Sequence, residues 1–480
     1  MSIKNKVMLI TYADSMGGDI KTLKQLLTTH FRKALGSIHI LPFYPSSADR
    51  GFAPMTYSKV DPSFGTWGDV EEIAEHFEMM YDFMINHISR QSAYFQDFVA
   101  HKDASKYRDL FIRWEQFWDE GRPSQSDIDA IYKRKPREPF TEVAFADGTS
   151  GKVWCTFDNE QIDLNLNNSV GKQFILDNLR YLAEHKASAI RLDAFAYAIK
   201  KQGTRCFFLE PEVYTMLEEI QSELNSYGIL VLPEIHEHYT MQLKLAEKGF
   251  WVYDFALPML LLHSIYEGEG SRLRHWLETC PRRQFTTLDT HDGIGVVDVI
   301  DLLSEQEIER TKQNIFNKGT NVKPAYNTIR YNNLDIYQIN STYYSALGNR
   351  DDAYLLSRAV QFFAPGVPQI YYVGLLAGEN DIALLEQTKI GRNINRHSYT
   401  YHEVEEQLKR PVVQQLLALM EFRNIYPAFD GDFSVEQDGD HTLILSWSKG
   451  EYWTRLEVDF CNLTYIISYS DPRKGKVILY

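Results

Sequence analysis

The sequence predicts an α/β protein of the (β/α)8 TIM barrel class, and two observations carry this prediction. Eight short apolar runs recur along the 480 residues, each too short for a buried helix but suited to a strand buried on both faces. Most runs are followed by stretches compatible with helices, and such alternation favours a parallel barrel. The predicted strands are 7–10, 38–41, 79–85, 189–192, 229–232, 251–255, 285–288 and 367–372. The main helices are predicted at 20–35, 68–78, 169–186, 210–226 and 410–423.

Two long gaps interrupt this alternation, after the third and the seventh predicted strands. Both leave from the carboxyl ends of strands, where barrel enzymes build their sites, so they predict inserted subdomains. After about residue 430 the pattern changes to short strands at 442–448, 452–460, 464–468 and 476–480. The predicted domains are a barrel (1–86, 167–292 and 350–430), inserted subdomains at 87–166 and 293–349, and a C-terminal β domain at 431–480.

The composition indicates a globular protein without nucleic-acid or membrane partners. Hydrophobic residues make up 44%, charged residues 24%, and the net charge of −15 repels nucleic-acid phosphates and anionic membranes. The apolar stretches are too short to span a bilayer or to form a signal peptide, so we expect a cytoplasmic protein. The four cysteines form no CxxC pair, which favours free buried thiols.

Polar residues gather at the predicted carboxyl ends of four strands. Arg191 and Asp193 share one face of their strand, and the arginine favours the ionised carboxylate that a nucleophile needs. Glu234 ends the next strand, where partial desolvation would let it hold a proton. Such a pair, expected about 5–5.5 Å apart, suits glycoside cleavage with retention. The whole group is Asn86, His87, Arg191, Asp193, Glu234, His236, His291 and Asp292.

Other polar residues have a simpler structural interpretation. A lone acid at a strand end is more often a loop cap than a catalyst, and we assign Asp254 to that role. Asp82 lies inside a strand and is expected to be a structural hydrogen-bond partner. His236 and His238 would suit a metal, but no third ligand has convincing spacing, so we expect neither a metal nor a cofactor.

Four blocks resemble the signature regions of the α-amylase superfamily, in order and in spacing: 82–87, 190–194, 233–236 and 288–292. Further stretches are similar to the sucrose phosphorylase family: 13–15, 41–46, 49–54, 253–258, 289–296, 333–338, 341–347 and 391–397. This resemblance implies a hexosyltransferase that reversibly converts sucrose and phosphate into α-D-glucose 1-phosphate and D-fructose. It implies a retaining double displacement through a β-glucosyl-enzyme, in a monomer or homodimer.

The resemblance also implies roles for individual residues. Asp193 matches the nucleophile, Glu234 the general acid/base and Asp292 a third carboxylate that binds glucose hydroxyls more tightly in the transition state. The residues matching the glucose site are Asp49, Phe52, His87, Arg191, His291 and Arg392. The residues matching the acceptor side are Phe157, Gln161, Tyr197, His236, Asp335, Tyr337 and Gln338. Phosphate is expected at Arg134, Tyr337 and His236, and Arg134 belongs to the basic segment 133–137.

Acceptor identity stays open between several alternatives. Arg134 and Lys135 stand where some relatives have Pro-Arg, and an extra cation suits a phosphorylated acceptor. The stretch 334–338 instead keeps the pattern of enzymes that act on plain sucrose. The alternatives are a phosphorylase for sucrose 6′-phosphate or another α-glucoside such as glucosylglycerate, an α-glucosidase-type hydrolase, and a non-catalytic binding protein on the same barrel.

Overall fold

The structure is a computed structural model that describes residues 3–133, 137–318, 338–436, 438–471 and 473–479. Arg134, Lys135, Asp335 and Tyr337 lie outside the described residues. Each of the eight predicted strands overlaps an observed strand of one eight-stranded sheet, in the order β10-β11-β14-β1-β2-β3-β8-β9. The strands are β1 (Met8–Thr11), β2 (Ser37–Ile40), β3 (Glu78–Met84), β8 (Ala187–Asp193), β9 (Leu230–Pro233), β10 (Val252–Asp254), β11 (Gln284–Thr286) and β14 (Val367–Tyr371). This confirms the (β/α)8 class.

The chain divides into two compact units, which we describe separately. The first unit consists mainly of Ile40–Ile235. In it β3, β8 and β9 pair in parallel, and Asp82 on β3 lies directly opposite Arg191 on β8. Helix α6 (Ser169–Glu184) packs on β8, and α7 (Glu212–Asn225) packs on β9. Helix α2 (Trp67–Ala74) begins with a capping box between Thr66 and Asp69. It ends before residue 78, where we expected more helix, because Glu78 already begins β3.

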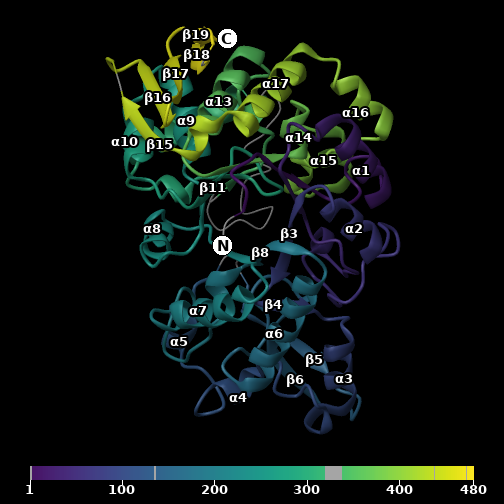
Figure 1. The fold of residues 1–480 in the computed structure, drawn as a ribbon. Helices are drawn as coiled ribbons and strands as arrows, with labels where there is room; N and C mark the ends of the chain where they lie inside the picture. Colours follow the sequence, from purple (N-terminus) through teal and green to yellow (C-terminus); the bar gives the residue numbers. More distant parts are fainter. Residues whose placement is uncertain (1–2, 134–136, 319–337, 437, 472, 480) are drawn as a thin grey trace. The chain divides into compact units, whose positions relative to one another are not determined.

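The segment between β3 and β8 has its own small strands (Figure 1). It also has its own hydrophobic core. Four tryptophan and isoleucine side chains, Ile112, Trp114, Trp118 and Trp154, pack together there. The elements are β4 (His87–Ser89), α3 (Ala93–His101), η3 (Lys102–Ala104), α4 (Trp114–Phe117), α5 (Gln125–Ala130), β5 (Phe140–Ala144), β6 (Ser150–Trp154) and β7 (Gln161–Asp163). Strand β4 pairs antiparallel with β7, and β5 with β6. Short 3-10 turns η2 (Asp49–Gly51) and η4 (Phe195–Tyr197) follow β2 and β8.

The second unit consists of Lys4–His39 and most of the chain after His236. Strands β10, β11, β14 and β1 pair in parallel within it. The helix expected at 20–35 is shorter, since α1 (Ile20–Leu26) continues as the π-helical turn η1 (Leu27–Phe31). Further elements are α8 (Thr240–Glu247), α9 (Leu257–Glu267), α10 (Ser271–Thr279), β12 (Ile294–Gly295), η5 (Val297–Val299), α11 (Glu305–Lys318), β13 (Gln338–Ile339), α12 (Tyr343–Ala346), α13 (Asp351–Phe363), α14 (Tyr372–Leu375), α15 (Ile382–Thr388), η8 (Gly391–Asn395), α16 (Tyr401–Gln407), α17 (Pro411–Ile425) and η9 (Pro427–Asp430).

A five-stranded antiparallel sheet completes the second unit and confirms the predicted C-terminal β structure. Its strands are β15 (Asp432–Glu436), β16 (Thr442–Lys449), β17 (Tyr452–Asp459), β18 (Thr464–Asp471) and β19 (Gly475–Ile478). Side chains of β16 alternate, so Leu443, Leu445 and Trp447 are buried. The boundaries predicted for the four domains stay predictions. Cys461 is exposed, contrary to the expectation of buried thiols, whereas the other three cysteines are buried. Among the described residues, no helix is both long and apolar enough to cross a membrane.

Candidate active site

The Arg191 guanidinium holds three carboxylates together in the first unit. Its side chain is only 4% exposed, and Nη1 donates to Asp82 Oδ1 and, at 2.9 Å, to Asp193 Oδ1. Its Nη2 lies 3.7 Å from Glu234 Oε1. Arg191 and Asp193 are two residues apart on β8, so the alternation of the strand places both on one face, as predicted. The structure therefore brings the predicted nucleophile and acid/base to one cation, and it confirms Asp82 as a buried structural partner.

The Glu234 carboxylate is also held by the backbone after β8. Oε2 accepts a hydrogen bond from the Ala194 N–H at 3.0 Å. Ala194 adopts the left-handed conformation, with φ of 56°, which is uncommon for a residue with a side chain. Such strained residues gather at functional sites, and this one presents its N–H to Glu234.

His87 is buried at the start of β4, and its hydrogen bond shows which ring nitrogen carries a proton. Its Nε2 lies 2.9 Å from the Phe52 carbonyl oxygen, which only accepts, so Nε2 carries the proton. Burial lowers the pKa of His87 and favours the neutral ring. Gln161 donates to the same carbonyl at 3.0 Å, which fixes the backbone of Phe52. The Phe52 ring lies 5.9 Å from the Arg191 guanidinium, and Asp49 is exposed in the turn just before it.

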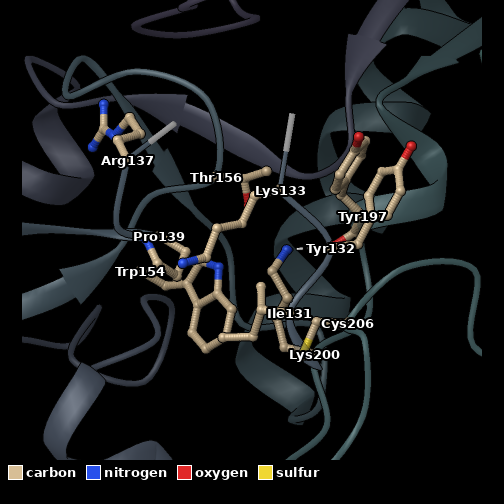
Figure 2. Close-up of a pocket in the computed structure, with 10 residues that line it drawn as sticks. All are labelled: Ile131, Tyr132, Lys133, Arg137, Pro139, Trp154, Thr156, Tyr197, Lys200 and Cys206. Carbon is tan, nitrogen blue, oxygen red and sulfur yellow. Dashed lines mark hydrogen bonds between the residues drawn. The ribbon is translucent and has the colours of Figure 1, made fainter. Parts of the chain in front are cut away.

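Two predicted acceptor residues contact each other next to His87. The Phe157 ring meets the His87 ring edge to face at 5.5 Å and the Tyr197 ring at 5.0 Å. Tyr197 also lines a small pocket together with Tyr132, Thr156 and Lys200 (Figure 2).

In the second unit, Asp292 is the centre of a different cluster. Arg392 Nη1 lies 3.1 Å from Oδ1, and the Nε2 atoms of His291 and His236 lie 3.7 and 3.9 Å from Oδ2. Burial alone would raise the pKa of Asp292, but the positive charges of Arg392, His291, His236 and Arg396 outweigh it and hold that pKa well below its usual range. Asp292 is therefore ionised at any ordinary pH.

Two side chains at the end of η8, those of Asn395 and Arg396, support this cluster by binding the backbone carbonyls of His291 and Asp292. Asn395 donates to the Asp292 carbonyl at 2.7 Å, and Arg396 donates to the His291 carbonyl at 2.9 and 3.0 Å. Sequence reasoning missed both residues as supports. Their only signal was their position inside the family-like stretch 391–397.

His236 stacks on Phe255, with ring centroids 3.8 Å apart and an interplanar angle of 20°. Its Nδ1 lies 3.8 Å from Asp298 Oδ2, while His238 instead contacts Asp301 Oδ2 at 3.0 Å. Predicted acceptor residue Gln338 is buried in β13, which pairs with β12. A Cβ at Gly295 on β12 would lie 2.2 Å from Asp298 Oδ2, so any larger residue there would displace the Asp298 carboxylate.

Two cations flank the phosphate-binding arginine expected at position 134. Lys133 Nζ lies 3.6 Å from Glu138 Oε2, and Arg137 donates to Asn159 Oδ1 at 2.8 Å. Part of the positive charge of segment 133–137 is thus neutralised or engaged within the protein. Arg134 itself, with Asp335 and Tyr337, stays a prediction.

Asp254 confirms the alternative interpretation as a structural cap. Its carboxylate accepts from the Leu257 N–H at 3.0 Å, at the start of α9, and from Trp276 Nε1 at 3.1 Å. Complete burial raises the pKa of Asp254 to about 6.

In its barrel fold, and in the carboxylates and the arginine that follow its strands, the chain is similar to the α-amylase superfamily. A family model described as "Alpha amylase, catalytic domain" matches residues 13–250. The chain is 50% identical to a sucrose phosphorylase of Streptococcus mutans, over 98% of this chain and 99% of that protein. It is 44% identical to a sucrose 6(F)-phosphate phosphorylase of Thermoanaerobacterium thermosaccharolyticum, over 99% of each chain. The crystal structure of sucrose 6F-phosphate phosphorylase from Thermoanaerobacter thermosaccharolyticum matches with a TM-score of 0.95 and 43% identity, over 100% of this chain and 98% of that one. The chain therefore belongs to the sucrose phosphorylase family.

Proposed function

We propose that the protein is a cytoplasmic sucrose phosphorylase, which transfers the glucosyl unit of sucrose to phosphate and releases α-D-glucose 1-phosphate and D-fructose. The observation that carries the proposal is the sharing of one buried guanidinium by Asp193 and Glu234. This arrangement suits a nucleophile and an acid/base acting on one glycosidic bond. The 50% identity to a sucrose phosphorylase over nearly the whole chain supports sucrose as the donor.

In the first step, Asp193 attacks the anomeric carbon while Glu234 gives its proton to the leaving oxygen of fructose. The ionised Asp292 accepts hydrogen bonds from glucose hydroxyls, and these bonds strengthen as the ring flattens toward the oxocarbenium-like state. Asp49, Phe52, His87, Arg191, His291 and Arg392 complete the proposed glucose site.

In the second step, phosphate takes the place of fructose and attacks the same carbon from the opposite side. The bond to Asp193 breaks, and the Glu234 carboxylate takes up the phosphate proton, which restores both groups. Two inversions give retention. The proposed acceptor residues are Phe157, Gln161, Tyr197, His236, Asp335, Tyr337 and Gln338, and the proposed phosphate contacts are Arg134, Tyr337 and His236.

The test is an assay of purified protein with sucrose, with and without phosphate, that measures glucose 1-phosphate, fructose and free glucose. We expect glucose 1-phosphate and fructose in equal amounts, and little free glucose while phosphate is present. Free glucose that forms at the same rate without phosphate, and no glucose 1-phosphate, would identify a hydrolase instead. Light scattering on the same sample distinguishes the proposed monomer or homodimer from larger assemblies.

A second candidate is a phosphorylase for sucrose 6′-phosphate, since relatives with that name are similar along the whole chain. Competition between sucrose and sucrose 6′-phosphate decides between the two donors. A higher kcat/KM for sucrose supports the main proposal, and a higher value for sucrose 6′-phosphate replaces it with the second.

A further inference from the structure

Lys200 is a buried cation whose N–H donors are all hydrogen-bonded within the protein. Its side chain is only 1% exposed, although it lies in a loop after β8. Its Nζ donates to Asp163 Oδ2 at 2.8 Å, to Asn86 Oδ1 at 2.7 Å and to the Tyr197 carbonyl oxygen. Figure 2 shows Lys200 with its bond to Tyr197 as a dashed line. An ammonium group has three N–H donors, so these three acceptors satisfy it fully.

The partner carboxylate extends the network to a third chain segment. Asp163 is fully buried on β7 and accepts from the Thr156 N–H at 2.9 Å and from the Thr156 hydroxyl. The Lys200–Asp163 pair thereby binds the side chain of Asn86, the N–H and hydroxyl of Thr156 and the carbonyl of Tyr197.

Each of these three segments carries one ring of a continuous aromatic row. Asn86 precedes His87, Thr156 precedes Phe157, and Tyr197 is itself the third ring. The rings meet edge to face at 5.5 Å (His87–Phe157) and 5.0 Å (Phe157–Tyr197). Such contacts are individually weak and tolerate sliding, so they do not by themselves set the spacing of three separate segments. The β4–β7 ladder joins the segment of His87 to that of Asp163. The buried, fully satisfied ion pair adds the segment of Tyr197 to them, because each member is costly to leave unpaired.

We propose that Lys200 and Asp163 are positioning residues that hold the His87, Phe157 and Tyr197 rings as one wall leading from the glucose site to the acceptor site. This inference rests on the proposed function, which assigns Phe157 and Tyr197 to the acceptor side. Loss of the pair lets the wall shift, and fructose and phosphate then bind in less productive positions. Formation of the glucosyl-enzyme depends mainly on the Arg191 cluster, and His87, the one ring of the wall in the proposed glucose site, is also held by the β4–β7 ladder, so this step changes less.

The test compares Lys200→Met with Lys201→Met. Lys201 is the adjacent lysine, its side chain is 61% exposed, and it pairs with Glu212 on the surface, so it is a matched control. Lys200→Met leaves Asp163 buried without its cation, which destabilises the fold, so the double variant Lys200→Met/Asp163→Asn removes both charges together. Circular dichroism and thermal unfolding establish which variants are folded.

Three quantities are measured on folded variants: KM for phosphate in phosphorolysis, KM for fructose in the reverse reaction, and the rate of the first fructose burst from sucrose. We expect both acceptor KM values to rise about tenfold or more and the burst rate to fall less than about threefold, because displacement of a binding wall acts on acceptor positioning. Lys201→Met should match the wild type. Unchanged acceptor KM values in the folded double variant would overturn the inference, and so would an equal change in the burst rate or in Lys201→Met.

The proposed function is tested separately, by whether the wild-type protein forms glucose 1-phosphate from sucrose and phosphate. If it transfers glucose to another acceptor, the same ratios are measured with that acceptor. The positioning role is then judged by the ratio of variant to wild type.

Discussion

The two carboxylate clusters differ in their ratio of acidic to basic side chains. In the first unit, one guanidinium, that of Arg191, contacts the carboxylates of Asp82, Asp193 and Glu234. In the second unit, the single carboxylate of Asp292 faces Arg392 and two imidazoles. A cluster with more acids than cations suits groups that form a bond or exchange a proton. A carboxylate surrounded by cations keeps its charge throughout and suits the binding of neutral hydroxyls.

The largest effect that tests this contrast is expected from Asp193→Asn. The amide keeps the shape of the side chain and its place beside Arg191 but cannot act as nucleophile. We expect kcat for glucose 1-phosphate formation to fall about 10⁴-fold or more, as for other residues that form the covalent intermediate. Asp177→Asn on the surface of α6 is the matched control, with a side chain 59% exposed. Near-normal activity of folded Asp193→Asn would assign the nucleophile elsewhere.

A smaller effect is expected from Arg392→Gln, which removes the cation nearest to Asp292. Its guanidinium is a third exposed, so the fold should tolerate the change. Loss of a charged hydrogen bond costs about 1.5–3 kcal/mol, which predicts a rise in KM for sucrose of about ten- to hundredfold. Arg350→Gln, at an exposed arginine paired with Asp352, should leave KM unchanged. An unchanged KM in Arg392→Gln would show that Asp292 does not depend on this cation.

The last effect is on stability and not on activity, and it concerns Asp254, a buried carboxylate whose hydrogen bonds come from neutral groups, the Trp276 indole, the Gln284 amide and the Leu257 N–H. Its pKa is raised from 3.8 to about 6, so between these values the folded state binds more protons than the unfolded chain. The protein therefore loses stability as pH rises through this window, by up to about 3 kcal/mol. Asp254→Asn stays neutral, so the stability of the variant relative to the wild type, measured by thermal unfolding, should increase between pH 4 and about 6.5.

For Asp292→Asn we expect the opposite dependence of stability on pH. The pKa of Asp292 is depressed, so its carboxylate stabilises the fold above the ordinary value of 3.8, and this stabilisation is lost only as pH falls through the lower folded value. The variant should therefore be less stable than the wild type at pH 7, and the difference should shrink in strong acid. Equal pH dependence of the two variants would contradict the opposite pKa shifts of Asp254 and Asp292.

Sequence patterns predicted the barrel strands because strands buried on both faces are continuous apolar runs, as at 79–85. They missed β15, where Asp432, Ser434 and Glu436 alternate with only two apolar residues. Sequence patterns identified Asp193 and Glu234 as site candidates because the strands of a barrel end at a common edge. They gave no sign of Lys200, since in the sequence it is indistinguishable from its exposed neighbour Lys201. Burial of a loop lysine depends on Asn86, Asp163 and Tyr197, which lie far apart along the chain.

The opposition of Asp82 and Arg191 on β3 and β8 has a consequence for how this chain can change length. Adding or removing one residue within either strand would turn one of these side chains to the other face and leave two charges buried apart. Insertions and deletions, in natural descendants or in designed variants, should therefore be excluded from the parts of β3 and β8 next to this pair, whereas the long segment that joins the two strands can change length. Arg191, which contacts Asp193, thus also limits, through its pair with Asp82, where the gene can gain or lose codons.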